Sequence, residues 1–477
     1  MPTPTQSIPR PRPQPRGDAR LRELSGGRLL PLLWGYAWPA LVTMSLNMLY
    51  NVVDRVYIGH GCGAEAIAGL ALTFPVMMVL GAFGPLIGVG SGTVISIALG
   101  EGDGVRAERA LGQCVALKLL LGVTVAPALF VLLGPILRAT AGGSVSPGAL
   151  GAGRTYLRIV LPFHFLAHLA FGLSACMRAE GSPKHAMRCM AVGAIANIVL
   201  DPVFIFVFGW GVAGAAWATN IAMALACAVA ISHYASGRSV VRLRARRVRV
   251  FPDLLWPVLA IGLSPFLMQL AGSTINFSLN HAFARWSGSP ERGTACVAAF
   301  GIFQTAMMLF FMPSMGVQQG IGPILGYNWG AKNYARVRRA WDLAFLLTTA
   351  AVCFASAAPV LLARPVAACF ASDPAVIDAG AFALRIGNCM LWCIGLNVAA
   401  TTYFQSVGRP STAIVLSLLR QVIVLLPCVW IMPHLFPSNP LLGVWLALPV
   451  SDFAAFLATI PPVLKERRAL LRKARAA

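Results

Sequence analysis

Long apolar stretches alternate along this chain with short breaks that are rich in Gly, Pro, Arg and Lys. Each stretch is long enough for a helix to cross a bilayer, which takes about 20 apolar residues. The pattern predicts an all-α membrane protein with twelve transmembrane helices. The expected spans are 31–59, 66–99, 110–138, 152–177, 185–208, 211–234, 254–284, 294–325, 338–363, 377–404, 412–432 and 441–464.

Composition supports a membrane protein. Of the 477 residues, 57% are hydrophobic and 11% are charged, whereas soluble domains carry roughly 25% charged residues. The eleven cysteines stand singly inside apolar runs, without the paired spacing of a disulfide framework or a zinc site. No metal site, no resident cofactor and no covalent chemistry is indicated, so we expect a protein that is not an enzyme.

The net charge of +22 raises the question of a nucleic-acid partner, and the placement of the charges argues against one. Arg and Lys gather in four clusters between or beyond the apolar runs, as in cytoplasmic loops next to anionic lipid. With both termini inside, 29 basic residues fall on the cytoplasmic side and 6 on the outer side. The sequence therefore predicts a multi-pass protein of a bacterial-type plasma (inner) membrane with both termini cytoplasmic.

The chain also shows a weak internal repeat. Trp38-Pro39 and Ser264-Pro265 stand 226 residues apart, as do Leu99-Gly100 and Leu325-Gly326. Because each copy holds six helices, the copies share one orientation, and we expect two parallel six-helix lobes around a central cavity. Such a protein would work by alternating access, which favours a transporter over a channel or receptor.

These observations divide the chain into five expected parts. The Pro- and Arg-rich N-terminus lacks the apolar core of a secretory signal, so a disordered tail is expected. The parts are a basic cytoplasmic tail (1–30), an N-lobe (31–235), a basic cytoplasmic linker (236–253), a C-lobe (254–464) and a basic cytoplasmic C-terminal tail (465–477).

Three of the sixteen acidic residues lie inside predicted spans, namely Asp54, Asp201 and Asp452. An ionisable group in hydrocarbon is costly and marks a functional candidate. Asp54 and Asp201 both belong to the N-lobe and lie about 9 and 12 Å below its outer boundary, at a rise of about 1.5 Å per residue. Two carboxylates at one depth can share a proton or hold a cation. The alternative, a pair between Asp54 and Arg55, is weaker because consecutive residues face different sides of a helix.

Three neutral polar residues accompany this pair. Asn197 precedes Asp201 by four residues and Tyr50 precedes Asp54 by four, so each shares a helix face with its carboxylate. Thr219 lies at a similar depth in the sixth span. Each one alone is compatible with helix packing, but the set at one depth predicts a proton or cation site. Asp452 stands apart as a possible secondary acid, with bonding to its neighbours as the alternative.

The motifs around these residues resemble the multidrug and toxin extrusion (MATE) family over residues 30 to 465. The segment Asn197-Ile-Val-Leu-Asp201-Pro202, with Arg178 to Pro183 before it and Gly214 to Thr219 after it, is similar to the helix 4 to helix 6 signature of that family. Pro39 with Asp54 looks like its bent first helix. Gln318-Gln319-Gly320 followed by Gly326 to Ala331 resembles its DinF/MepA-like branch.

The resemblance implies that Asp54, Asp201, Asn197, Tyr50 and Thr219 form a cation-coupling site. Pro39 and Pro265 are expected to bend their helices. The sequence departs from the family twice: no Asn occurs between Tyr156 and Met177, where Ser174 is the expected substitute, and the C-lobe spans lack the acids of the sodium-coupled branch. Protons are therefore the favoured coupling ion, with sodium left open.

The expected function is a monomeric, ion-coupled antiporter that exports amphipathic or cationic small molecules. The partners would be those substrates and membrane lipid. A lipid-linked sugar flippase of the same wider superfamily is the first alternative. It would be expected to line its cavity with basic residues. Of the 38 basic residues, only Arg55, Arg385 and Arg420 are assigned to span interiors, and Lys118 is counted with the cytoplasmic loops.

Overall fold

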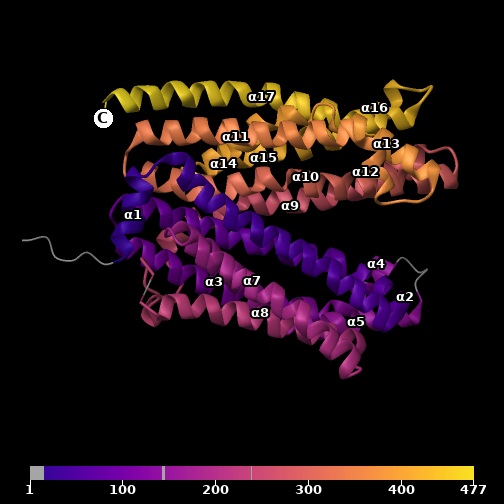
Figure 1. Cartoon of the computed structure of the whole chain (residues 1–477), viewed down its shortest axis with the longest axis horizontal. Coiled ribbons are helices and arrows are strands. Elements are labelled where there is room, and N and C mark those ends of the chain that lie inside the picture. The colour runs from indigo at the N-terminus through magenta and orange to yellow at the C-terminus, as the bar shows by residue number, and fades with distance from the viewer. Residues whose placement is uncertain (1–15, 142–145, 238, 477) are drawn as a thin grey trace, which may run out of the picture.

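The computed structural model describes residues 16–141, 146–237 and 239–476, and every regular element in these residues is a helix (Figure 1). The N-terminal part holds α1 (Arg16–Gly26), α2 (Leu29–Gly100), α3 (Gly104–Val131), α4 (Leu133–Ala141), α5 (Pro147–Val160), η1 (Leu161–Phe163), α6 (His164–Ala179), α7 (Pro183–Pro202), η2 (Val203–Val207), α8 (Gly211–Ala235) and η3 (Ala245–Arg247). The C-terminal part holds α9 (Pro252–Trp286), α10 (Pro290–Gly330), α11 (Tyr334–Leu361), α12 (Ala363–Ala368), α13 (Pro374–Asn388), η4 (Leu391–Cys393), α14 (Ile394–Ser406), α15 (Pro410–Leu418), η5 (Leu419–Leu425), α16 (Leu426–Leu435) and α17 (Pro440–Ala476).

The long element α2 contains two membrane spans. Seventy-two residues of unbroken helix would extend about 108 Å, more than three times the thickness of a bilayer core. The backbone leaves the helical region at Gly63, where φ is 80° and ψ is −178°. That conformation suits glycine, which has no Cβ. Counting α2 as two spans, the eleven long apolar helices in the described residues give the twelve spans that the sequence predicts, and the expected fold class is confirmed.

Helix starts follow the local sequence. Asp103 caps α3 by accepting a hydrogen bond from the backbone N–H of Arg106, and Asn333 caps α11 in the same way through Arg336. Proline occupies the first turn of several other helices, where its missing N–H costs nothing. Pro39 and Pro265 lie within continuous helix, so the chain is not broken at either residue, and the bends expected there stay predictions.

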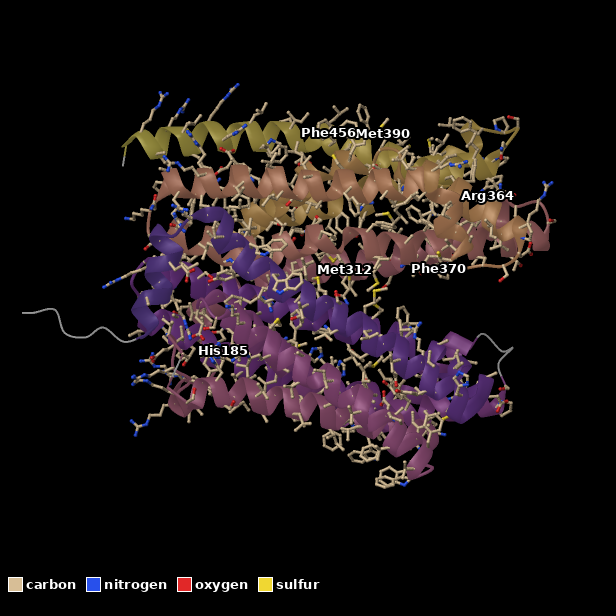
Figure 2. All side chains as sticks on the ribbon, in the orientation of Figure 1. His185, Met312, Arg364, Phe370, Met390 and Phe456 are labelled. Atoms are coloured by element: carbon tan, nitrogen blue, oxygen red, sulfur yellow. The ribbon has the colours of Figure 1, made fainter. Side chains whose placement is uncertain are left out.

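The helices form two bundles that lie side by side (Figure 1). Elements α2 to α8 make up the N-lobe and α9 to α17 the C-lobe. The lobes are in contact at the end of the molecule where α1 and the end of α17 lie, here called the terminal end. There, Leu254, Val258 and Ile261 of α9 belong to the same apolar cluster as the inner half of α2. Figure 2 shows that long basic side chains gather at this end.

Glycines allow the two lobes to approach closely at the terminal end. A Cβ added to Gly90 of α2 would lie 2.0 Å from the carbonyl oxygen of Val258, and one added to Gly262 of α9 would lie 1.6 Å from that of Leu86. The same holds between α2 and α10: a Cβ added to Gly100 would lie 2.0 Å from the carbonyl oxygen of Tyr327, and one added to Gly330 would lie 2.1 Å from that of Ile97. No side chain fits at these positions, so this end of the interface is closed.

Two sequence expectations need correction. The expected disordered tail contains α1, whose Leu24 is fully buried and whose backbone carbonyl accepts hydrogen bonds from Asn328 and Arg336. The part of that expectation covering residues 1–15 lies outside the described residues. Residues 465–476 of the expected basic C-terminal tail continue α17 as helix, with Leu470 fully buried, because Leu470 packs in the same apolar cluster as Leu24.

The second correction concerns Lys118, which the sequence placed among the cytoplasmic loop cations. It lies inside α3, fully buried, and its ammonium group donates to the carbonyl oxygens of Phe83 and Gly84 at 3.1 and 2.8 Å. A charge at mid-helix is satisfied there by backbone acceptors of α2. The linker is also packed rather than free, because the N–H of Val241 binds the buried Glu180 carboxylate at 3.0 Å.

Candidate functional site

The two N-lobe carboxylates come from α2 and α7. Asp201 is fully buried at the end of α7, next to Pro202 and the wider π-helical turn η2. π-Helical turns inside α-helices are frequent at functional sites. Asp54 lies half-buried in the first span of α2. The side chains of Asp54 and Asp201 lie close enough to interact with each other.

Asn197 links this pair to α8. Its amide donates to Oδ1 of Asp201 at 3.2 Å and reaches the Thr219 hydroxyl at 3.5 Å. Tyr50 lies close enough to both carboxylates to interact with them electrostatically. The structure therefore brings together all five residues that the sequence singled out, from three elements.

The site has more acceptor oxygens than donors. Oδ1 of Asp54, Oδ2 of Asp201 and Oδ1 of Asn197 are buried and have no hydrogen-bond partner. Buried acceptors without donors are rare in folded proteins, since each one costs free energy. A proton between the carboxylates, or a cation coordinated by the three oxygens, would satisfy them. No cluster of three or more metal-binding side chains of the His, Cys, Asp and Glu type occurs in the described part of the chain.

Tyr156 is a member of this neighbourhood that the sequence reasoning missed. It is buried in α5, and it lies near Thr219, Asp54, Tyr50 and Asp201. Its position near the outer end of the fourth span, at the depth of the other five residues, was the available signal. Tyrosine can both donate and accept, so it can relay a proton change to α8.

Ser174 does not belong to the site, contrary to expectation. It lies eighteen residues beyond Tyr156 on the same span, about 27 Å further along the helix axis. Its hydroxyl accepts a hydrogen bond from Arg178 at 2.9 Å near the terminal end. Ser174 was expected at the site because of its polar side chain alone. Its depth in the membrane differs from that of the carboxylate pair, and only residues at the same depth can be in contact.

Asp452 forms a separate polar site in the C-lobe. Its Oδ1 is 2.5 Å from Nε of Arg420, and its side chain is almost fully buried. Arg420 lies in η5, a second π-helical segment. Asp452 is therefore half of a buried ion pair between η5 and α17, and it takes no part in the N-lobe carboxylate pair.

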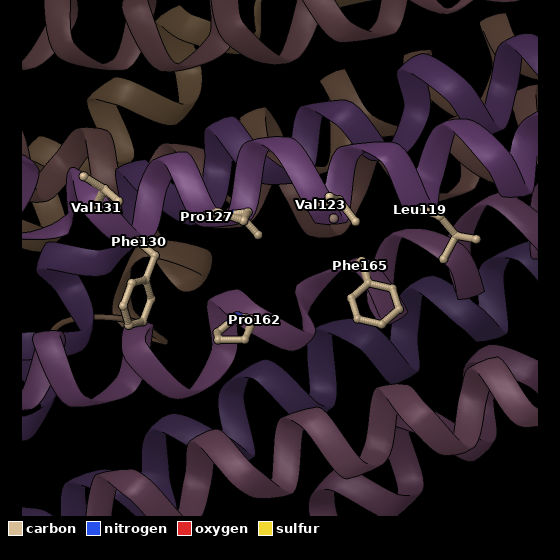
Figure 3. Close-up of a pocket in the computed structure, with 9 residues that line it drawn as sticks. Leu119, Val123, Pro127, Phe130, Val131, Pro162 and Phe165 are labelled. Atoms are coloured by element: carbon tan, nitrogen blue, oxygen red, sulfur yellow. The ribbon is translucent and has the colours of Figure 1, made fainter. Parts of the chain in front are cut away.

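A groove of about 590 Å³ on the N-lobe has no polar chemistry. It runs between α3 and the η1–α6 junction, and every side chain that lines it is apolar, including Val123, Pro127, Phe130 and Phe165 (Figure 3). Val123 and Val131 are more than 70% exposed. This surface suits lipid chains.

Met312 of α10, by contrast, lies on the side of the C-lobe that faces the N-lobe (Figure 2).

A twelve-span, two-lobe bundle with a buried carboxylate pair defines a membrane transport protein, not an enzyme. The sequence model of the MatE family matches residues 39–203 and 269–431, and the chain belongs to this family. The multidrug export protein MepA of Staphylococcus haemolyticus is 26% identical over 448 residues, which cover 92% of this chain and 95% of MepA.

Solved structures agree with this assignment. A multidrug resistance MATE family transporter of the MOP superfamily, in its outward-facing conformation, superimposes with a TM-score of 0.86 at 25% identity, over 96% of this chain and 99% of that one. A MOP superfamily transporter from Pyrococcus furiosus, described as having a binding pocket of reverse polarity, gives a TM-score of 0.84 at 26% identity over 95% and 98% of the two chains.

Proposed function

We propose that this chain is a proton-coupled antiporter that exports amphipathic, often cationic, small molecules by alternating access. Membership of the MatE family and the relatives named as multidrug export proteins support export of such molecules. The proposal places the protein in a bacterial-type plasma membrane as a monomer, with both termini cytoplasmic. The basic side chains at the terminal end support that orientation.

The observation that carries the coupling proposal is the juxtaposition of Asp54 and Asp201. Two carboxylates side by side in a low-dielectric interior repel each other when both are ionised. One shared proton removes that repulsion and supplies the missing donor to their unpartnered oxygens. The pair is therefore a site whose occupancy changes the electrostatic energy of the N-lobe.

The arrangement of the lobes connects this occupancy to transport. The lobes are in contact at the terminal end through Gly90, Gly262, Gly100 and Gly330, which supports a conformation closed toward the cytoplasm. The carboxylate pair lies toward the opposite end, from which a proton would enter. Protonation can change the conformational equilibrium only if it favours one state, at about 1.4 kcal/mol per tenfold shift.

The coupling ion is tested with purified protein in vesicles carrying a fluorescent cationic substrate. A proton gradient at equal sodium on both sides is expected to drive transport, and a sodium gradient at equal pH is not. Transport that strictly requires sodium would overturn the choice of ion and move the three unpartnered oxygens to the role of sodium ligands. Transport driven by neither gradient would overturn ion coupling itself.

The flippase alternative has less support. It calls for basic residues that are free to hold an anionic lipid phosphate, and Arg420 in the C-lobe is instead paired with Asp452 at 2.5 Å. Lys118, in the N-lobe interior, is likewise held by two backbone carbonyls. Both of these cations already have partners.

A further inference from the structure

A second groove lies on the C-lobe, between α11, α14 and α17, and encloses about 210 Å³. Elements α11 and α17 are on the side of the C-lobe away from α8 and the rest of the N-lobe (Figure 1). The groove is therefore separate from the interface between the lobes and from the carboxylate pair. Seven of its nine lining residues are apolar, among them Phe345, Leu396 and Val463, and the other two are Asp342 and Arg467.

The two charged residues form an ion pair at the mouth of the groove. Nη2 of Arg467 is 2.7 Å from Oδ1 of Asp342, and the side chains are 54% and 39% exposed. Both therefore keep free surface for a ligand. Asp342 lies four residues inside the apolar run 338–363, and Arg467 lies three residues beyond the run 441–464. The first of these runs begins at the terminal end and the second finishes there, so the pair stands where hydrocarbon gives way to head groups.

We propose that this groove binds a phospholipid whose head group carries a primary ammonium group beside its phosphate. An acyl chain fills the apolar part between Phe345, Leu396 and Val463. The guanidinium of Arg467 binds the phosphate, and the Asp342 carboxylate accepts hydrogen bonds from the ammonium group.

Charge complementarity favours this class over other lipids. An anionic head group without an amine would place its phosphate beside the Asp342 carboxylate, with Arg467 as the one cation shared by both anions. A quaternary ammonium carries the charge but has no N–H to donate. The groove of Figure 3, between α3 and α6, has no charged lining residue and offers no such selection.

The wall of the groove is rigid. Trp341, which lines it, stacks on Tyr403 with ring centroids 4.0 Å apart. The hydroxyl of Tyr403 donates to Glu466 at 2.9 Å, and Glu466 also pairs with Arg409. A lipid bound at Asp342 and Arg467 would join α11 to α17 across this network and stabilise the C-lobe.

The test is native mass spectrometry of the full chain, purified in detergent and offered equal amounts of phosphatidylethanolamine, phosphatidylglycerol and phosphatidylcholine with identical chains. The wild type is expected to retain phosphatidylethanolamine about fivefold over the other two, the size expected for one exposed charge pair. Asp342→Asn should abolish the preference over phosphatidylglycerol, and Arg467→Gln should weaken retention of all three lipids. Leu396→Trp, which fills the groove, should also weaken retention of all three lipids.

Two controls keep the result specific. Arg106→Gln removes a matched pair with Glu101, also 2.7 Å long and 37% and 39% exposed, and should change nothing. Asp342→Glu keeps the carboxylate and should keep the preference. Lipid-induced shifts in Tm are compared with the same variant without lipid, so a less stable variant does not mimic lost binding. Equal retention of the three lipids by the wild type, or an unchanged preference in Asp342→Asn, overturns the proposal.

Discussion

Asn197 donates a hydrogen bond from its side-chain amide to Oδ1 of Asp201, one helical turn further along α7, at 3.2 Å. The same amide reaches the Thr219 hydroxyl on α8, so a change at the carboxylate is felt by two helices. The other oxygen of Asp201 has no hydrogen-bond partner, and Asp54 lies close to this carboxylate. One oxygen of Asp201 is therefore held by Asn197, and the other is free to accept a hydrogen bond or bind a proton.

Asp201→Asn is expected to abolish proton-driven efflux, with a loss of at least about tenfold, and to leave the protein folded. Asparagine keeps the volume but cannot exchange a proton, and a neutral side chain avoids the desolvation cost of a buried charge, so stability should hold or rise. Asp54→Asn should behave nearly the same. Efflux is measured at matched membrane abundance, with Asp378→Asn on the exposed Arg364 pair as the control. Normal efflux by the Asp201 variant would leave that residue a structural role only.

Asp452→Asn should affect stability more than transport. Removing one partner of a buried ion pair leaves the other charge uncompensated at a cost of about 3–5 kcal/mol, and the 25% exposure of Arg420 reduces this to about 2 kcal/mol. The Tm in detergent should fall, with partial efflux retained. The double variant Arg420→Met with Asp452→Leu should recover most of the loss. A double variant as unstable as the single one would show that the pair is not the reason.

Gly262→Val is expected to prevent closure at the terminal end. The added Cβ would lie 1.6 Å from the carbonyl oxygen of Leu86, so α2 and α9 must separate. Efflux should be lost, and a single cysteine introduced at the inner part of α9 should react faster with a thiol reagent applied from the cytoplasmic side. Gly272→Ala on the same helix is the control, because no atom lies within 4 Å of its added Cβ. Unchanged labelling and efflux in Gly262→Val would contradict the closed interface.

Leu24→Ala should loosen the contact between α1 and the C-lobe. Leu24 is fully buried, and truncating a buried leucine costs about 2–5 kcal/mol. Thermal unfolding should begin at a lower temperature, and limited proteolysis should cut near α1 first. Leu30→Ala, at a residue that is 56% exposed, should have little effect. Equal behaviour of the two variants would mean that α1 does not hold the terminal end together.

The orientation is tested with topology reporters. A reporter fused after Arg249 is expected to be cytoplasmic, and one inserted near Ser289 to be external, because basic residues concentrate on the side that holds Arg249. Activity of a cytoplasm-specific and a periplasm-specific enzyme at each site gives the answer. The reverse pattern would invert the proposed orientation and, with it, the side from which protons enter.

The sequence by itself determined the twelve spans and the candidates for the carboxylate pair. A run of about 20 apolar residues has the length of a membrane span, so the spans can be recognised in the sequence. An ionisable side chain such as Asp201 costs free energy in hydrocarbon, so an acid inside a span indicates a functional site. Helical periodicity also placed Asn197 on the face of Asp201. Packing between distant segments has no comparable pattern in the local sequence. For this reason the sequence predicted a disordered tail where the structure has α1 with its buried Leu24.

Only the tertiary structure decided which polar residues meet. Ser174 and Tyr156 share a span, but Tyr156 lies at the depth of Asp54 and Ser174 lies near the other end, bonded to Arg178. Arg420 and Asp452 are 32 residues apart in the chain, and their pairing needs η5 and α17 to pack together. A side chain in the membrane takes its partner from whichever helix packs beside it at its own depth, and that neighbour is set by contacts between distant segments.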